Sequence, residues 1–182
     1  MRAEAPKSLQ RVEIFAERLV DCLQPIEFFL DAEPKSIGHN HTFGEDISDT
    51  QTLHAMLCHL TEKAAKRLRD AGLFARTLTL TIRYASFKTI TRARTLHEPT
   101  DLDSVILATM KDLFARNRDT KQKVRLLGVS LSEFSHQQQQ QLALLDTVQN
   151  ERAEKLARAA DRLRDKFGFD KLQRASSLPV EE

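Results

Sequence analysis

The segment between Arg76 and Thr95 has the residue types best suited to binding a ligand. It holds five basic residues and no acidic one, in a chain with 26 acidic residues. Guanidinium groups bring charge and paired donors to phosphate oxygens, and short hydroxyl side chains donate further hydrogen bonds. The segment therefore favours a surface for a nucleic-acid backbone, with a merely solvated basic surface as the alternative. The basic residues are Arg76, Arg83, Lys88, Arg92 and Arg94, and the hydroxyl residues are Thr77, Thr79, Thr81, Ser86, Thr89, Thr91 and Thr95.

Two strands must position these side chains. Residues 77–84 alternate apolar and polar residues, as a strand with one buried and one polar face does, and 89–96 form a second β-rich run. The short connection predicts a hairpin. We place the basic residues on the polar face, although a bulge in the second strand would exchange its faces. Few aromatic residues lie on this face, so we expect contacts to phosphate with little base stacking.

The flanking patterns complete a fold. A strand is expected at 35–43, a helix from Asp49 or Thr50 to about Ala71, a helix opening at 99–101 and a strand at 124–134. The order β-α-β-β-α-β is typical of ferredoxin-like α+β folds. We predict a four-stranded antiparallel-type sheet with two helices on one face, leaving the other face to solvent or a partner.

The remaining segments are expected to lie outside this domain. We divide the chain into a helical arm (1–34), the domain (35–135), a glutamine-rich linker (136–150) and a charged helix with a tail (151–182). Residues 8–23 have an amphipathic helical pattern, which is most often a packing face and is also suited to self-association.

Several other classes of function find no support in the sequence. Two cysteines without metal-like spacing fit a reducing compartment, and the charged N-terminal thirty residues lack the apolar core of a signal peptide. His39 and His41 lack a third ligand nearby in the sequence, so we expect no metal, and no cofactor-binding loop is recognisable. We expect a cytoplasmic protein.

Four segments resemble the little-finger domain, the C-terminal DNA-gripping domain of Y-family DNA polymerases, and most closely that of the DNA polymerase IV type. They lie in the same order and at similar spacing over about residues 35–134. The segments are Lys-Ser-Ile-Gly-His-Asn-His-Thr-Phe (35–43), Arg-Thr-Leu-Thr-Leu-Thr-Ile-Arg-Tyr (76–84), Phe-Lys-Thr-Ile-Thr-Arg-Ala-Arg-Thr-Leu (87–96) and Val-Arg-Leu-Leu-Gly-Val (124–129).

The resemblance implies a role in translesion synthesis and DNA repair. In this family the sheet lies in the major groove and grips the phosphates of the primer–template. By matching position, the expected DNA contacts are Ser36, Ile37 and Gly38 through backbone amides, and Arg83, Lys88, Thr89, Thr91, Arg92, Arg94 and Thr95.

The resemblance does not extend to catalysis. The family's palm carries the metal-binding carboxylates, and only 34 residues precede the matching region here. We therefore expect no DNA-directed DNA polymerase (nucleotidyltransferase) activity from this chain on its own.

A second short motif follows the last strand. Gln141, Leu142, Leu144 and Leu145 resemble the peptide with which bacterial polymerases dock on the sliding clamp, with Leu145 in place of an aromatic residue. The alternative is a glutamine tract that runs into an ordinary helix. If the motif functions, the chain could act instead as a protein-interaction or regulatory fragment, through the clamp or a partner polymerase.

Overall fold

The computed structural model describes residues 34–136, 147–172, 174 and 175. Contacts divide the chain into Met1–Glu33 and Pro34–Glu182, and the description below concerns the second unit. The amphipathic segment 8–23 and the Gln141–Leu145 peptide lie outside the described residues. The proposed subdivision at 135 and 150 stays a prediction.

Four strands form one sheet in the order β1-β4-β2-β3, and all neighbouring strands are antiparallel. The predicted element order and the α+β class are confirmed. The strands β1, β2 and β3 are longer than their patterns indicated, because the pairing continues beyond the alternating residues, for example at Ile47, Phe74 and Ala75. Their bounds are Ser36–Ile47 (β1), Phe74–Tyr84 (β2), Thr89–Thr100 (β3) and Val124–Ser135 (β4).

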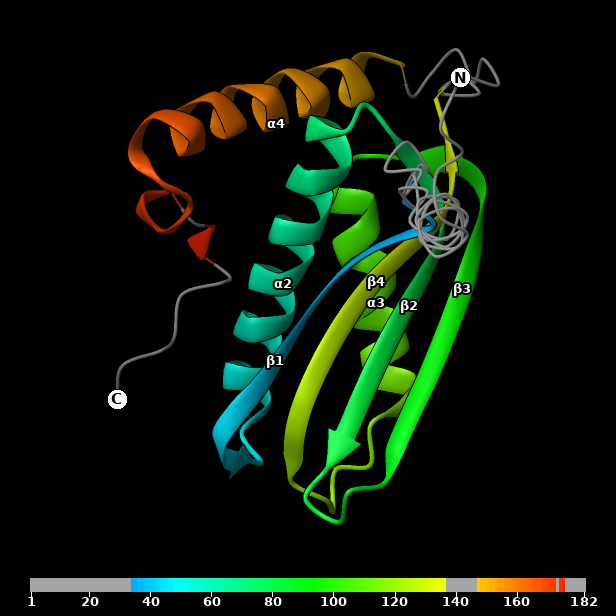
Figure 1. Cartoon of the computed structure of the whole chain (residues 1–182), viewed down its shortest axis with the longest axis vertical. Coiled ribbons are helices and arrows are strands. Elements are labelled where there is room, and N and C mark those ends of the chain that lie inside the picture. Colours follow the sequence, from blue (N-terminus) through cyan, green and yellow to red (C-terminus); the bar gives the residue numbers. More distant parts are fainter. Residues whose placement is uncertain (1–33, 137–146, 173, 176–182) are drawn as a thin grey trace, which may run out of the picture. The chain divides into compact units, whose positions relative to one another are not determined.

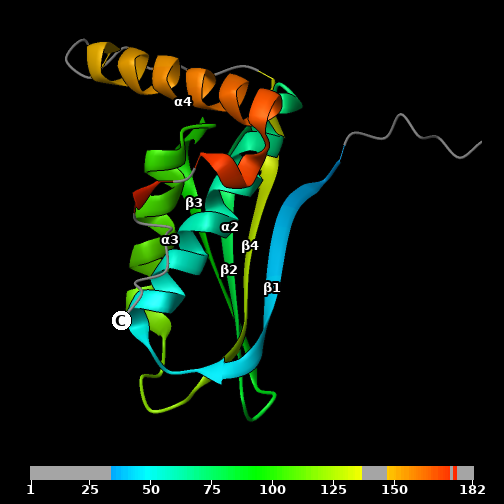
Figure 2. The ribbon, with the colours of Figure 1, turned by 90° about the vertical axis from the view of Figure 1, so that its left-hand side faces the viewer.

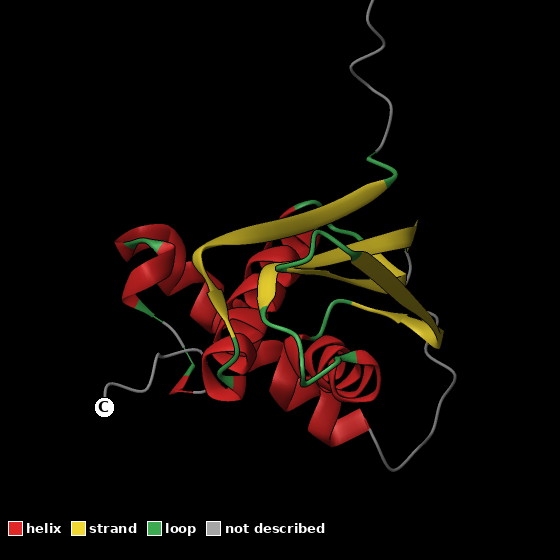
Figure 3. Cartoon of the chain, turned by 90° about the horizontal axis from the view of Figure 1, so that it is seen from below, coloured by secondary structure: helices red, strands yellow, loops and turns green. Residues whose placement is uncertain are grey.

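Two helices cover one face of the sheet and leave the other face open (Figure 1, Figure 3). Helix α2 spans Thr50–Asp70, and its N-cap Asp49 accepts a 2.6 Å hydrogen bond from the Thr52 amide. It ends before Gly72, whose φ of 66° is the left-handed conformation that closes many helices. Helix α3 spans Asp103–Asn117.

The core lies between these helices and the sheet. Leu57 and Leu68 of α2 and Phe114 of α3 are buried against the central strands β2 and β4. Cys58 is fully buried, as a small apolar side chain would be.

A third helix, α4 (Thr147–Phe167), and a short 3₁₀ helix (Phe169–Lys171) follow the sheet in sequence. Helix α4 begins four residues earlier than predicted and crosses near one end of α2 (Figure 2). Among the described residues, no helix combines the length and apolarity required to cross a lipid bilayer.

Gly38 provides a test of how closely β1 approaches β4. A Cβ at Gly38 would lie 2.9 Å from the main-chain oxygen of Val129, so the strands would have to separate. We expect Gly38→Ala to lower the free energy of unfolding by about 1–3 kcal/mol, measured by urea denaturation. Gly44→Ala in the same strand is the matched control, since nothing lies within 4 Å of its added Cβ, and it should change stability by less than about 0.5 kcal/mol. Equal effects of the two changes would contradict the close approach.

Candidate nucleic-acid interface

The register of the sheet decides which side chains share its open face. Residues directly opposite each other in antiparallel strands point to the same side. Where the four strands pair without interruption, residues that lie opposite each other form rows across the sheet, with one residue from each strand. Four such rows, called ranks below, lie on this side and give sixteen positions. They are Ser36, Gly38, Asn40 and Thr42 of β1, Leu126, Gly128, Ser130 and Ser132 of β4, Thr77, Thr79, Thr81 and Arg83 of β2, and Thr89, Thr91, Ala93 and Thr95 of β3.

This open face is a layer of small, mostly hydroxyl-bearing side chains. Ten of the sixteen positions are serine or threonine, and none is acidic or aromatic. Threonine suits a strand because of its branched Cβ, and its hydroxyl both donates and accepts hydrogen bonds. A polar face of this kind requires no covering layer, and it offers many short donors to a polyanion.

Small residues let the sheet backbone come close to whatever binds. Gly38 of β1 and Ala93 of β3 are exposed at the two edges of this face. At Gly128 of β4 the side-chain oxygen of Asn40 occupies the place that a Cβ would take, so Asn40 covers this buried glycine. A phosphodiester chain could therefore reach the main chain at the edges of the face, and the hydroxyls between them.

Charge on the open face is concentrated toward one end. Arg83 is the one charged residue among the sixteen, and its Nε donates to Oγ1 of Thr89 at 2.9 Å. At the opposite end of the strands, Thr77 donates to the carboxylate of Glu133 at 2.8 Å and shares a 2.8 Å hydrogen bond with Thr95. An anionic ligand is thus favoured at the end near Arg83.

The prediction that Arg92 and Arg94 lie on the open face is wrong. No register shift occurs between Thr89 and Thr95, so β3 alternates strictly and its threonines and arginines point to opposite sides. The two arginines pair with Leu80 and Leu78, on the side of the sheet that the helices cover. The shift that does occur in this hairpin lies between Ala75 and Thr77, and therefore beyond Thr95 on β3.

Both arginines instead contact α3 at the outer edge of the sheet. Arg94 forms a 2.5 Å ion pair with Asp112, which also binds Arg116. Desolvation acts to raise the pKa of Asp112, but the hydrogen bonds from Arg94 and Arg116 outweigh it and hold that pKa below its ordinary value. Arg92 donates to Asn117 at 3.1 Å and to a main-chain oxygen, both neutral groups. Arg92 therefore keeps more of its charge for an external anion than Arg94 does.

The other predicted contact residues are placed as follows. Ser36, Gly38, Arg83, Thr89, Thr91 and Thr95 share the open face, and Lys88 lies in the β2–β3 turn. The side chain of Ile37 belongs to the core, so only its backbone can face a ligand. Arg76 is exposed near the far end, where its Nε donates to the Leu96 oxygen. Sequence reasoning missed Ser130 and Ser132, which the alternation with Val129 and Leu131 could have revealed.

The histidines of β1 lie on the helix side of the sheet. Burial lowers the pKa of His39, and the nearby positive charges of Arg67 and Lys63 on α2 lower it further. Within residues 34–136 and the described C-terminal part, no group of three potential ligands could hold a metal ion.

Comparison with known proteins agrees with this geometry. The sequence model of the impB/mucB/samB family C-terminal domain matches residues 34–144. The chain belongs to this family. That membership confirms the resemblance to the C-terminal region of Y-family DNA polymerases.

Curated relatives include proteins named DNA polymerase IV. The one from Dehalococcoides mccartyi (strain ATCC BAA-2266 / KCTC 15142 / 195) is 34% identical over 160 residues, which are 87% of this chain and 40% of that protein. The one from Halorhodospira halophila is 42% identical over 107 residues, 59% of this chain and 30% of that protein. This chain thus spans about two fifths or less of the length of these relatives.

One solved structure, titled as a complex of the beta-clamp processivity factor and the little finger domain of PolIV, has 20% sequence identity and a TM-score of 0.47. The likeness covers 60% of this chain and 98% of that one.

The family match ends before α4, which an ion-pair network joins to the helices behind the sheet. Arg164 of α4 binds Glu62 of α2 at 2.8 Å, with side chains only 3% and 1% exposed. Arg69 of α2 binds Asp103 of α3 and Asp161 of α4 at 2.7 and 2.6 Å. This network lies on the helix side, away from the open face.

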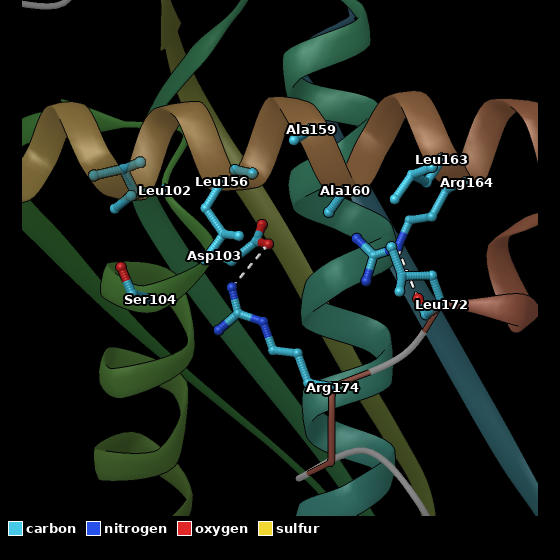
Figure 4. A pocket seen from close by; sticks show the side chains of 12 residues that line it. Leu102, Asp103, Ser104, Leu156, Ala159, Ala160, Leu163, Arg164, Leu172 and Arg174 are labelled. Carbon is cyan, nitrogen blue, oxygen red and sulfur yellow. Dashed lines mark hydrogen bonds and ion pairs between the residues drawn. The ribbon is translucent and has the colours of Figure 1, made fainter.

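The C-terminal segment extends the same network. Arg174 binds Asp103 and Glu62 at 3.1 and 3.2 Å, and Arg164 donates to the Leu172 oxygen (Figure 4). Beside these contacts lies an apolar cavity of about 460 Å³, bounded by α4, the start of α3 and this segment. Burial raises the pKa of Glu62, while Arg164 and Arg174 act against that rise.

Removing the carboxylate at the centre of this network should be costly. Glu62→Gln removes the closest partner charge of the buried Arg164 guanidinium and leaves it the 3.6 Å contact with Asp161. We expect a loss of about 3–5 kcal/mol in the free energy of unfolding, measured by chemical denaturation. Glu151→Gln is the control, because Glu151 and Lys155 are exposed and 3.8 Å apart, and it should cost less than about 0.5 kcal/mol. A Glu62→Gln protein as stable as wild type would show that the network contributes nothing net.

Proposed function

We propose that this chain binds duplex or primer–template DNA as the little-finger region of a Y-family translesion polymerase. The observation that carries the proposal is the open face, where ten hydroxyl side chains and Arg83 lie on a sheet with no acidic residue at any of its sixteen positions. Such a face suits phosphate oxygens, which accept hydrogen bonds and carry no sequence information. The expected binding is therefore weak in its sequence preference, and its salt dependence comes from Arg83 and the basic residues at the margins of the face.

The width of the sheet supports a position across the major groove. Four strands about 4.8 Å apart place the two edge strands roughly 14 Å from each other. The major groove of B-DNA is about 12 Å wide. The edges β1 and β3 would then lie over the two phosphate chains, with the small side chains of β2 and β4 above the groove between them.

This position assigns different roles to the basic residues. Arg83 and Lys88 lie at the hairpin end of the face, and Arg92 extends from the outer edge of β3, where a phosphate chain would pass. Ser36 and Gly38 occupy the opposite edge, and a strand edge leaves backbone groups free to bind a phosphate. Arg94 contributes least, because Asp112 already neutralises it.

In this proposal the chain supplies DNA binding and not the transfer of nucleotides. Two-metal polymerisation requires carboxylates that converge on a cleft, and the relatives named DNA polymerase IV are more than twice as long as their matched portions. Primer extension with Mg²⁺ and all four nucleotides should therefore yield no product from this chain alone, and a product would contradict this part of the proposal.

Docking on a sliding clamp is a second candidate function, favoured by Gln141, Leu142, Leu144 and Leu145. The glutamine would bind the clamp surface while the leucines fill an apolar pocket. A purified bacterial clamp should retain the wild-type chain and retain Leu144→Ala less well. If the clamp retains neither protein, this candidate fails while DNA binding stands.

The salt dependence of DNA binding separates Arg83 from Arg94. Each phosphate neutralised adds about −0.9 to the slope of log K against log salt concentration. We expect Arg83→Gln to reduce the magnitude of that slope by about 1 and to weaken all duplex sequences alike, as measured by fluorescence anisotropy of a labelled duplex.

Arg94→Gln is the matched comparison, since Asp112 keeps its bond to Arg116 and the charge removed was already paired. Its slope should equal that of wild type. A wild-type slope near zero would remove the proposed function altogether, and equal losses from both variants would remove the assignment of roles.

A further inference from the structure

One aromatic side chain stands apart at the end of the β2–β3 hairpin. Phe87 is 65% exposed, and its φ of 61° is in the left-handed region. Hydrogen bonds from the Phe87 amide to the Tyr84 oxygen and from the Tyr84 amide to the Lys88 oxygen, both 2.9 Å, hold this tight turn. A bulky residue in this conformation is unusual, because glycine or asparagine adopts it at lower cost.

The turn itself gives no reason for a phenylalanine at this position. The ring is mostly exposed to solvent, so it adds little to the core, and an exposed aromatic side chain is itself unfavourable. Within the described part of the chain, the guanidinium of Arg125 contacts the ring, 4.6 Å from its centroid. Strained backbone of this kind is often found where a protein binds a ligand. A ligand that contacts the ring would explain why a phenylalanine occupies this turn.

The surroundings of Phe87 are predominantly basic. Lys88 follows it in the turn, and the α3–β4 loop that contains Lys121 and Lys123 lies at the same end of the sheet (Figure 1). The Ala85 amide donates to the Lys123 oxygen at 2.9 Å, which joins the two loops. Carboxylates are also present at this end, namely Asp119 of the loop and Glu45 and Asp46 of β1.

Asp119 and Asp46 are engaged within the protein, and Glu45 is exposed. Asp119 accepts hydrogen bonds from the Lys121 amide and the Gln122 side chain at 3.0 and 2.7 Å. Asp46 lies 4.0 Å from Arg125. The last rank of the open face, with Arg83 and Leu126, is next to this turn, so the Phe87 ring lies at the basic end of the hydroxyl-rich face.

We propose that Phe87, under Arg125, is a stacking platform for an unpaired nucleobase of the DNA that lies on the open face. The inference rests on the proposed function and adds a partner to it: the single strand where the duplex ends. Arg125 lies over one face of the ring, so the opposite face is the one offered to a base, and the guanidinium adds a positive charge near the adjoining phosphates. The open face has no aromatic residue of its own, so stacking would be confined to this turn.

The test compares three DNA probes with the wild-type chain. They are a blunt duplex, the same duplex with a short single-stranded thymidine overhang, and the same duplex with an abasic overhang of equal length. The abasic overhang keeps the phosphates and lacks the bases, so it isolates stacking from charge. We expect the thymidine overhang to bind roughly 5- to 20-fold more tightly than the abasic one, which is the lower range for stacking of one base.

Phe87→Asn removes the ring and keeps a residue that accepts the left-handed conformation. It should abolish the preference for thymidine over abasic overhangs and leave affinity for the blunt duplex unchanged. Phe87→Leu, which keeps an apolar side chain without an aromatic face, should lose the same preference. If either variant retains the full preference, stacking on Phe87 is overturned.

Fluorescence provides an independent readout. The chain contains no tryptophan, so Phe87→Trp introduces a single reporter at the turn. Its emission should be quenched by the thymidine overhang and much less by the abasic overhang or the blunt duplex. Equal quenching by the thymidine and abasic overhangs would contradict the proposal.

The outcomes separate this inference from the proposed function. Salt-dependent binding of the blunt duplex, with equal affinity for both overhangs, would overturn the stacking platform alone. Loss of salt-dependent duplex binding would overturn the proposed function. The comparison of overhangs with the wild-type chain requires no substitution. Equal affinity for the thymidine and abasic overhangs would therefore overturn the stacking platform even if a variant fails to fold.

Discussion

The antiparallel register of the sheet is the constraint on which the interface depends. Because opposite residues share a face and successive residues alternate, the register sorts the side chains into two sets over the part of the sheet where the four strands pair without a shift. The apolar set packs against α2 and α3, and the hydroxyl set stays on the open side. A slip of one residue in β2 would move Leu78 and Leu80 into solvent, so the same burial that stabilises the fold also keeps the threonines together.

The alternation has a second consequence for charge. A strand presents alternate residues on opposite sides, and in β3 the odd positions hold Thr89, Thr91 and Thr95 while Arg92 and Arg94 hold even positions. The threonine hydroxyls therefore lie on the open face, and the two arginines lie at the edge of the sheet, where Asp112 and Asn117 of α3 are their partners. The interface is therefore a nearly neutral, hydrogen-bonding surface with cations at its margins, which differs from a sheet lined with guanidinium groups.

The reverse side of the domain is held by a different interaction. Glu62, Arg164, Asp103 and Arg69 form a nearly buried network that ties α4 to the two helices. Buried ion pairs give little net stability but require accurate geometry, so the network fixes where α4 lies. In the sequence, helix α4 follows the segment with the clamp-like peptide. It packs on the helix side of the domain, opposite the open face.

Much of this protein could be predicted from its sequence. Residues 77–84 alternate so clearly that both the strand and its polar face are visible, and the stripe of leucines in 53–68 indicates a helix. The order of elements also follows from local patterns, because period and turn chemistry are properties of neighbouring residues. What the sequence could not decide was the position of Arg92 and Arg94, since one inserted residue would reverse their direction, and only the hydrogen-bonded pairing with β2 shows that none occurs. The partners of Glu62 and the contact between Phe87 and Arg125 likewise depend on residues distant in the chain, and only the tertiary structure brings such groups together.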